Sequence, residues 1–480
     1  MTTVPETDKD KLPLSTVLPI VLSLLVAIFA FQLNASMLSP ALATMERELS
    51  ATTAEIGLTQ TAFFTAAALF SLFLPRWGDL IGRRKVMVGM LIVTAVGCAI
   101  SAVAPSVTVL FIGRIIQGAA GPIVPISLIM LRAEIPSGRQ YALLMAILTS
   151  INGGIAGVDA LAGGWLAANY GFRSIFWVMT VVCTVAVLSV RFFIKETTAS
   201  ETPPMDWKGV LPIVVALGAT LIALNEAGKL AAANWLLVAV LLVVGAVGFV
   251  IFWNVEKRVA HPLVSTTYMK QRRTWALLLT TTLTMTGVFA VMNGLVPNLA
   301  QDPSVGAGLS ADTVSWVTLT PYALAGLLMG PISGKLAGRL GYNRVLQIGL
   351  IGTAAGLGLT LFAAGAPSAL LLLFVSIFVG ITYAGMSNIM LNGLGIVLSP
   401  EDNPGYLPGM NSGAFNLGAG LSFAVLFAAS TLITEMSGPR AGYMGGIATG
   451  AVILVLAFLA SFLIPKPADL DTKQTEGSKP

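Results

Sequence analysis

Long apolar runs separated by short polar segments make up most of the 480-residue chain. Each run is near the ~20 residues that a helix needs to cross a bilayer, and the runs are continuously apolar rather than alternating. This pattern predicts a membrane protein built of transmembrane helices. The fourteen runs lie at 14–42, 54–74, 86–103, 107–131, 140–167, 174–193, 210–225, 235–253, 275–297, 313–334, 345–364, 368–397, 407–432 and 441–464.

Composition narrows the class of protein further. The chain is 56% hydrophobic and 10% charged, which leaves too little polar surface for a soluble domain of this length. Cys98 and Cys183 lie within apolar runs, and with the single His261 they provide no metal site, so we expect no metal and no cofactor. The net charge of +5 is expected to come from basic loops and not from a nucleic-acid-binding surface.

Two charged loops form an internal repeat. The first covers 75–85 and joins the second and third runs, and the second covers 334–344 and joins the tenth and eleventh. Alignment of the loops pairs Gly82 with Gly341 and Lys85 with Arg344, whereas Asp79 falls on Gly338. The repeat therefore predicts an all-α membrane protein with two six-helix bundles and two inserted helices.

Domain boundaries follow from this arrangement. We expect a cytoplasmic N-terminal tail at 1–13 and a first six-helix bundle at 14–195. A linker with two inserted helices should occupy 196–273, and the second bundle 274–464. Residues 465–480 read as a polar, solvated cytoplasmic tail.

The distribution of Lys and Arg predicts the orientation. With both termini in the cytoplasm, nearly all cations of the loops between runs fall on the cytoplasmic side. Only Arg47, Arg173, Lys229 and Arg440 fall on the other side. We therefore expect a multi-pass protein of the inner (plasma) membrane with both termini cytoplasmic.

Several motifs resemble those of the major facilitator superfamily. The loop motif G-x-L-A-D-R-x-G-R-K is matched at Asp79, Gly82, Arg83, Arg84 and Lys85, and R-x-x-Q-G at 114–118. The segment 256–264 is similar to the linker of the fourteen-helix drug:proton antiporters within that superfamily. This resemblance implies alternating access without an enzymatic reaction, with Asp79, Gly82, Arg83 and Arg84 as a conformational switch.

The chain departs from that family at two positions. The antiporter pattern G-x-x-x-G-P-x-x-G-G ends here at Gly163-Gly164, but Asp159-Ala160 occupy its Gly-Pro position. In the first run, Asn34 stands where such proteins often carry an aspartate. An asparagine cannot take up a proton, so we expect the protonatable acid to have moved to Asp159.

Arg114 is expected to be the partner of Asp159. Counted along their helices, Asn34, Arg114 and Asp159 all lie ~11–12 Å below the outer surface. A cation in mid-membrane is costly and is kept for a partner or a task. The two residues are therefore predicted to couple transport to protons, and the alternative is a permanent salt bridge that only joins helices.

Other polar residues within the runs are candidates for a substrate cavity. They are Gln32, Asn34, Gln117, Asn152, Asn293, Tyr322, Tyr383, Asn388 and Asn416. Helix joining is the alternative role for each one.

The sequence predicts a secondary transporter and not an enzyme. No nucleotide-binding loop or nucleophile motif is visible, so the proton gradient is the expected energy source. The competing class is a membrane-bound enzyme or a channel without a transport cycle. The resemblance implies export of lipophilic or cationic drugs, with multidrug efflux and antibiotic resistance as the biological role. A transporter of one particular metabolite or lipid is the alternative. The expected partners are the bilayer, protons and a small-molecule substrate, with the protein as a monomer.

Overall fold

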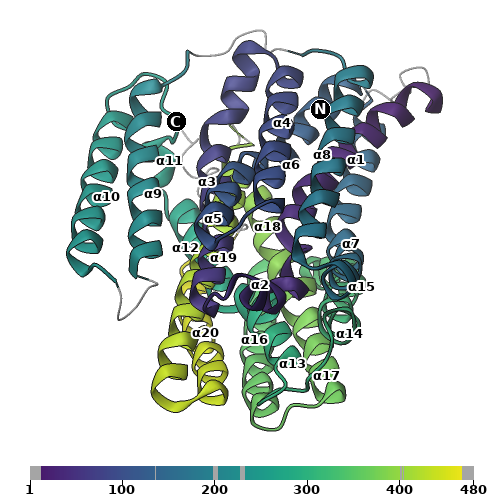
Figure 1. Cartoon of the computed structure of the whole chain (residues 1–480). Helices are drawn as coiled ribbons and strands as arrows, with labels where there is room; N and C mark the ends of the chain where they lie inside the picture. Colours follow the sequence, from purple (N-terminus) through teal and green to yellow (C-terminus); the bar gives the residue numbers. More distant parts are fainter. Residues whose placement is uncertain are drawn as a thin grey trace.

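The regular secondary structure of the described residues is entirely helical (Figure 1). The computed structural model describes residues 12–135, 137–197, 204–227, 233–400, 403 and 405–466, with only the backbone at several positions in 138–156. Thirteen helical stretches in this part of the chain are long and apolar enough to cross a membrane. The 33-residue helix α7 occupies the place of the fifth predicted run. Together they form the predicted fourteen-helix fold.

The first bundle contains the helices before the linker. Their bounds are α1 (Leu14–Ser36), η2 (Ser39–Ala41), α2 (Leu42–Leu49), α3 (Thr53–Ile81), α4 (Arg83–Ala102), α5 (Val107–Gln117), η3 (Gly118–Ala120), α6 (Ile123–Glu134), α7 (Gly138–Tyr170) and α8 (Phe172–Phe193). A capping box starts α3, since Thr52 accepts from the Glu55 amide and Glu55 accepts from the Thr52 amide.

The inserted pair consists of α9 (Trp207–Ala227) and α10 (Trp235–Glu256). Figure 1 shows the two helices side by side at the left edge of the molecule. α9 is longer at both ends than the predicted run at 210–225. Arg76 of α3 donates to the carbonyls of Pro204, His261 and Pro262 at 2.7–3.1 Å, so the first bundle holds both ends of the inserted pair.

The second bundle follows the short linker helix α11 (Thr266–Met269). Its elements are α12 (Arg272–Ala290), η5 (Val291–Leu295), α13 (Val296–Gln301), α14 (Ala311–Val314), η6 (Ser315–Leu319), α15 (Thr320–Leu340), α16 (Tyr342–Gly365), α17 (Ala369–Val379), η7 (Gly380–Ser387), α18 (Asn388–Val397), α19 (Tyr406–Ser437) and α20 (Pro439–Ser461). The elements η5, η6 and η7 are π-helical turns, which are frequent at functional sites.

The repeated loops have the same backbone geometry in both bundles. Gly82 ends α3 with φ +118°, and Gly341 ends α15 with φ +83°. Only glycine adopts such values without strain, so each loop can reverse the chain in one residue. We call the end of the molecule that carries these loops the hinge end, and the opposite end, with the turns at Gly171 and Gly438, the far end.

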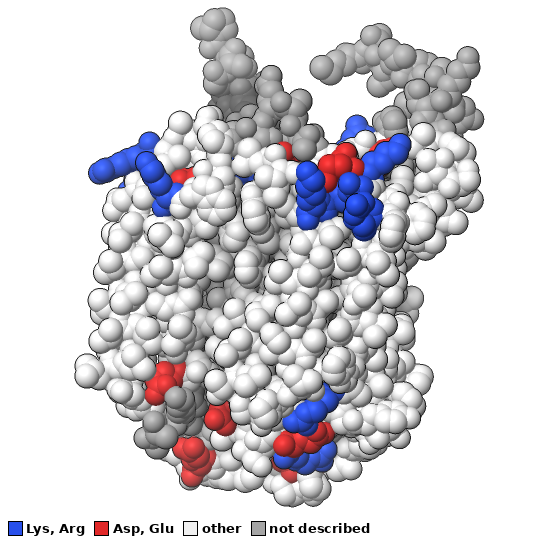
Figure 2. Space-filling model, turned by 45° about the horizontal axis from the view of Figure 1, so that its top comes forward, with Lys and Arg blue, Asp and Glu red and all other residues white. Residues whose placement is uncertain are grey.

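Charged side chains are confined to the two ends of the face seen in Figure 2. Lys and Arg gather at the upper end of that face, and the band between the ends is free of charge (Figure 2). Large apolar side chains such as Leu211, Val243 and Phe362 are exposed along the helices. This surface is suited to contact with lipid.

Candidate functional site

Arg114 of α5 is completely buried. Its guanidinium donates to Gln117 Oε1 at 2.6 Å, to Gln60 Oε1 at 2.9 Å and to the carbonyl oxygen of Asn34 at 3.1 Å. The guanidinium carbon lies 4.3 Å from the ring centre of Phe63, a cation–π distance. Neutral groups therefore stabilise the buried cation, and no acid in the described part of the chain forms an ion pair with it.

The amides of two predicted cavity residues are engaged in helix packing. Gln117 Nε2 donates to Ser101 Oγ at 2.7 Å and to the carbonyl of Gly97 at 3.0 Å. Asn34 Nδ2 donates to the carbonyl of Ala30, and its Oδ1 accepts from the Cys98 thiol at 3.3 Å. In this conformation both amides hold α1, α4 and α5 together.

Asp159 lies in α7 with 2% of its surface exposed. Its Oδ2 accepts a short hydrogen bond from the hydroxyl of Ser36, which in turn accepts from Gln32 Nε2 at 3.0 Å. Its Oδ1 is buried and has no hydrogen-bond partner among the described residues. A carboxyl group in this position has one oxygen free to bind a proton or a donor.

Arg114 and Asp159 contact the same turn of α1 but do not contact each other. Arg114 binds the carbonyl of Asn34, and Asp159 binds Ser36, two residues further along α1. The direct ion pair that the sequence led us to expect is not formed in this structure: the two terminal guanidinium nitrogens of Arg114 bind Gln117, Gln60 and the Asn34 carbonyl, and its buried Nε has no partner among the described residues. The two groups are connected through α1.

A cluster of phenylalanine rings joins the two bundles next to Arg114. Phe63 contacts Phe64 with a ring-centre distance of 5.0 Å. Phe64 contacts Phe289 of α12 edge-on at 5.2 Å and stacks on Phe423 of α19 at 6.4 Å. The cation–π contact of Arg114 with Phe63 therefore links the buried cation to the contact between bundles.

In the second bundle, the predicted residues on π-helical turns are packed between helices. Tyr383 on η7 stacks on Tyr322 at 6.3 Å, and its hydroxyl donates to Met285 Sδ at 2.7 Å. Asn293 on η5 donates to the carbonyl of Phe289 at 3.0 Å.

The remaining predicted cavity residues differ in their contacts. Asn416 on α19 is 3% exposed, and its side chain forms no hydrogen bond with the described residues. Asn388 Oδ1 accepts from Asn392 Nδ2 at 3.1 Å, which joins successive turns of α18. The side chain of Asn152 lies outside the described residues.

The bundles are closed against each other at the far end. Five hydrogen bonds between described residues cross from one bundle to the other there. They are Thr61 Oγ1 to Gly420 O at 2.9 Å, Gln301 Nε2 to Pro40 O at 3.0 Å, Ser315 Oγ to Ala160 O and Thr320 Oγ1 to Gly157 O at 2.7 Å, and Asn298 Nδ2 to Glu46 Oε1 at 2.8 Å. A Cβ on Gly164 would lie 2.4 Å from the carbonyl oxygen of Ala311. We call this contact region the seam.

The hinge end lacks such contacts. A Cβ added to Gly334 or Gly338 of α15, or to Gly405 or Gly409 near the start of α19, would have no atom within 4 Å. No hydrogen bond between described residues joins the two bundles directly at this end. Among the described residues, the hydrogen bonds that close the bundles against each other thus lie at the far end and not at the hinge end.

The predicted switch residues interact within the first bundle. Asp79 at the end of α3 accepts from Arg83 Nε at the start of α4 at 2.6 Å, an ion pair across the chain reversal at Gly82. The backbone amide of Arg84 donates to Glu196 Oε1 at 3.0 Å, and Glu196 also lies against Gly82. In this conformation none of these groups contacts the second bundle, so the proposed switch role concerns another conformation.

Comparison with protein families decides the classification. A model of the Major Facilitator Superfamily matches residues 24–255 and 277–480. The chain belongs to the major facilitator superfamily. Its two hinge loops and two six-helix bundles agree with this assignment. Separately, no group of three or more potential metal-ligating side chains occurs in the described residues.

Among members of the superfamily, the chain is 59% identical to a uridine/deoxyuridine transporter of Lactococcus lactis subsp. cremoris. That match covers 97% of this chain and 98% of the relative. Multidrug resistance protein Stp of Mycobacterium tuberculosis is 25% identical, over 83% of this chain and 73% of its own length. The solved structure of the nucleoside transporter NupG shares the fold, with a TM-score of 0.61, 16% identity and coverage of 92% of this chain and 100% of NupG.

These comparisons correct one expectation from the sequence. The expectation of drug export is wrong, because the near-full-length relative at 59% identity is a nucleoside transporter and the multidrug relative is far more distant. The expected role in multidrug efflux and antibiotic resistance is not supported for the same reason. The physical signal was present in the sequence, since Asp159-Ala160 replace the Gly-Pro of the drug antiporters.

Sequence reasoning missed Ser36 and Glu46, and it noted Gln60 only as one of the polar residues within the apolar runs. Gln60 binds Arg114, Ser36 binds Asp159, and Glu46 binds Asn298 across the seam. Ser36 carries no charge, and Glu46 follows the apolar run in a segment that reads as a loop. The available signal that Gln60 could bind Arg114 was its polar side chain on the face of α3 that is turned toward α5.

Proposed function

We propose that the chain transports uridine and deoxyuridine across the membrane by alternating access, driven by the proton gradient. The 59% identity to a uridine/deoxyuridine transporter over nearly the whole length of both chains carries this proposal. Sequence similarity of this extent spans both bundles, and a cavity between the bundles takes its side chains from each of them.

The chemistry of the site supports a nucleoside. The uracil edge has two carbonyl acceptors and one N–H donor, which side-chain amides and a carboxyl group complement, and the ring can stack on aromatic side chains. Among the described residues, the Asn416 side chain, Gln60 Nε2 and Asp159 Oδ1 have no hydrogen-bond partner. We therefore rank these three residues ahead of Asn34 and Gln117, whose amides are already bonded, as groups that bind the substrate.

Proton coupling is assigned to Asp159 with Arg114 as its partner through α1. The carboxyl group lies against the seam, and its free oxygen can bind a proton or the substrate in turn. Exchange of its Ser36 contact for a contact with Arg114 would change the packing of α1 against both helices. The alternative is that Asp159 and Arg114 only hold the helices together permanently. A substitution at Asp159, described in the Discussion, distinguishes the two roles.

The orientation completes the proposal. The basic hinge end and both termini face the cytoplasm, the far end faces outward, and the protein acts as a monomer in the inner membrane. The cation asymmetry of the loops supports this orientation. In this orientation the seam would close the outer end of the transporter, and the domain boundaries predicted from the sequence would delimit the two moving bundles.

The test is uptake of labelled uridine into liposomes that contain the purified protein. We expect labelled uridine to exchange with unlabelled uridine and deoxyuridine inside the liposomes. An imposed pH gradient should cause net accumulation of uridine, and a protonophore should abolish this accumulation. A cationic dye such as ethidium should not compete. Absence of uridine movement in protein that remains folded would contradict the proposal.

A further inference from the structure

Glu46 bridges the two bundles at the far end. It lies in α2 of the first bundle, and its Oε1 accepts from Asn298 Nδ2 of α13 in the second bundle at 2.8 Å. Its Oε2 accepts from Thr53 Oγ1, at the start of α3, at 3.2 Å. Of the hydrogen bonds between the bundles that the described residues form, this is the one in which an ionisable side chain takes part.

The charges around Glu46 do not favour a second negative charge. Burial raises the pKa of Asp302, at the end of α13, but hydrogen bonds from the hydroxyl and amide of Ser304 outweigh it and hold the pKa below its usual value. Asp302 is therefore ionised and acts on Glu46 as a like charge, while the Tyr443 hydroxyl of α20 faces Asp302. Arg47 is exposed and donates to Thr44, so it provides only a weak counter-charge.

Asn298 gives independent evidence that the Glu46 carboxyl group is protonated when the seam is closed. Its Oδ1 is buried and has no donor. A carboxylate can only accept hydrogen bonds, whereas a protonated carboxyl group can donate to the oxygen of a side-chain amide and accept from its nitrogen. A buried acceptor without a donor costs about 1–3 kcal/mol, so closure of the seam around Asn298 favours the protonated form of Glu46.

We propose that Glu46 is a proton-binding site of the seam, which binds a proton when the bundles close the far end and releases it when that end opens. The proposal rests on the proposed transport function and orientation. Its sign follows from linkage: the closed seam binds the proton more tightly, so acid conditions stabilise closure and the stabilisation is lost as the pH rises. A proton from outside would thereby assist closure of the far end after substrate binding.

The experiment measures the opening of the far end directly. Tyr170 at the end of α7 and Leu370 at the start of α17 are 66% and 77% exposed and lie on different bundles at this end. Both are changed to cysteine and spin-labelled in a chain without Cys98 and Cys183, and pulsed electron paramagnetic resonance gives their distance in acidic and in mildly alkaline buffer. We expect a longer-distance population that grows with pH, by about tenfold for each pH unit between the proton affinities of the two states.

Three variants separate the proton site from general effects. Glu46→Gln is uncharged and can bond to both amide atoms of Asn298, so the far end should remain closed at both pH values. Glu46→Asp keeps a titratable group and should keep part of the pH response. Glu48→Gln is the matched control, because Glu48 lies on the same helix but pairs with Arg173 of the first bundle at 2.9 Å, and its response should equal that of the parent chain.

The same preparations are tested for uridine exchange in liposomes. A pH response that persists unchanged in Glu46→Gln, or that is absent from the parent chain, would overturn the proton site. Absence of uridine exchange with a normal pH response would instead overturn the proposed function and leave the proton site standing. The two proposals therefore fail separately.

Discussion

The hydroxyl of Ser315 in the second bundle donates a hydrogen bond of 2.7 Å to the carbonyl of Ala160 in the first bundle. Ala160 directly follows Asp159, so the buried carboxyl group lies one residue away from a contact that must break when the far end opens. A change in the protonation of Asp159 can therefore act on the seam through the backbone of α7. This relationship underlies the first prediction.

Asp159→Asn is expected to abolish uphill accumulation of uridine under a pH gradient while exchange at equal pH continues. An amide keeps the hydrogen bond to Ser36 but cannot release a proton. Both activities are measured in liposomes, with Asp312→Asn as control because Asp312 lies near the start of α14, bonds to Ser310 and should not affect accumulation. Full proton-driven accumulation by Asp159→Asn would leave Asp159 with a structural role only.

Arg114→Lys is expected to lower both stability and transport. A lysine cannot direct donors at Gln60, Gln117 and the Asn34 carbonyl at once, and each buried group left without a partner costs about 1–3 kcal/mol. The measurement is the thermal unfolding of the purified protein. Arg83→Lys serves as control, since Arg83 is partly exposed and its ion pair with Asp79 is worth less than about 1 kcal/mol. Equal melting temperatures of the two variants would contradict the prediction.

Gly164→Ala is expected to weaken closure of the far end. The added Cβ would lie 2.4 Å from Ser315 Oγ and from the carbonyl oxygen of Ala311, so the bundles must move apart. Uridine uptake should fall and the far-end distance between spin labels should lengthen. Gly358→Ala is the control on α16, where a Cβ has no atom within 4 Å and alanine should be neutral or stabilising by about 0.5–1 kcal/mol. Equal behaviour of the two variants would show that the seam tolerates the extra volume.

Asp79→Asn tests the switch role of the hinge. Its ion pair with Arg83 lies within one bundle and is partly exposed, so its loss should change the stability of the present conformation by less than about 1 kcal/mol. A role in the conformation closed at the hinge end predicts that uridine uptake nevertheless falls and that the far end opens less often. Unchanged uptake and unchanged far-end opening would remove this role.

The orientation is tested with single cysteines at Asn169 and Asn343 in a chain without Cys98 and Cys183. Asn169 lies near the end of α7 at the far end, and Asn343 lies at the start of α16 at the hinge end. An impermeant thiol reagent added to intact cells should label only the first. Labelling of the second alone would reverse the orientation.

Much of the fold could be predicted because its determinants are local. Each membrane span depends on the length of an apolar run, and each hinge depends on a glycine at the point of reversal. Gly82 and Gly341 were matched by sequence alone, and both adopt a positive φ at the start of a helix. The broken helices were harder to foresee, since the π-helical turn at Val291–Leu295 has no marker in the hydrophobic pattern.

The site was less predictable, because the position of a residue along a helix gives its depth in the membrane but not the direction in which its side chain points around the helix axis. The count of residues placed Arg114 and Asp159 at one level, and both do contact the same turn of α1. Their rotation about α5 and α7 decides the partners, and it turns Arg114 toward Gln60 of α3. The identity of the substrate depends on still fewer side chains, which the motifs do not include. The motif resemblance therefore favoured drugs as substrates, whereas the relative at 59% identity is a uridine/deoxyuridine transporter.

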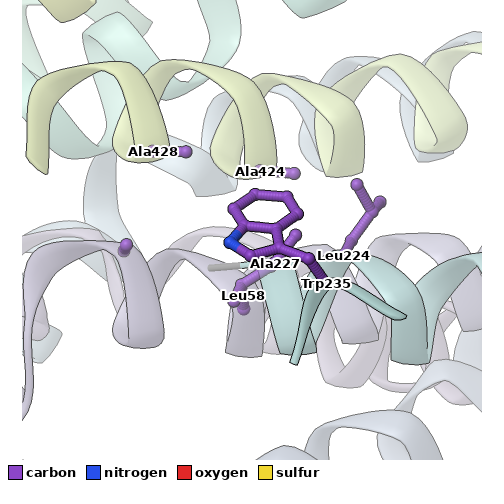
Figure 3. A pocket seen from close by; sticks show the side chains of 7 residues that line it. Leu58, Leu224, Ala227, Trp235, Ala424 and Ala428 are labelled. Atoms are coloured by element: carbon purple, nitrogen blue, oxygen red, sulfur yellow. The ribbon is translucent and has the colours of Figure 1, made fainter. Parts of the chain in front are cut away.

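An apolar groove lies between the inserted pair and the two bundles. Figure 3 shows the indole of Trp235 between Ala424 of α19 and Leu58 of α3, in a groove of about 190 Å³. Its walls belong to both bundles, so its volume changes whenever the bundles tilt. In the proposed transport cycle, a lipid chain that entered this apolar groove would be displaced and readmitted. We therefore expect the thickness and tension of the membrane to affect the rate of turnover.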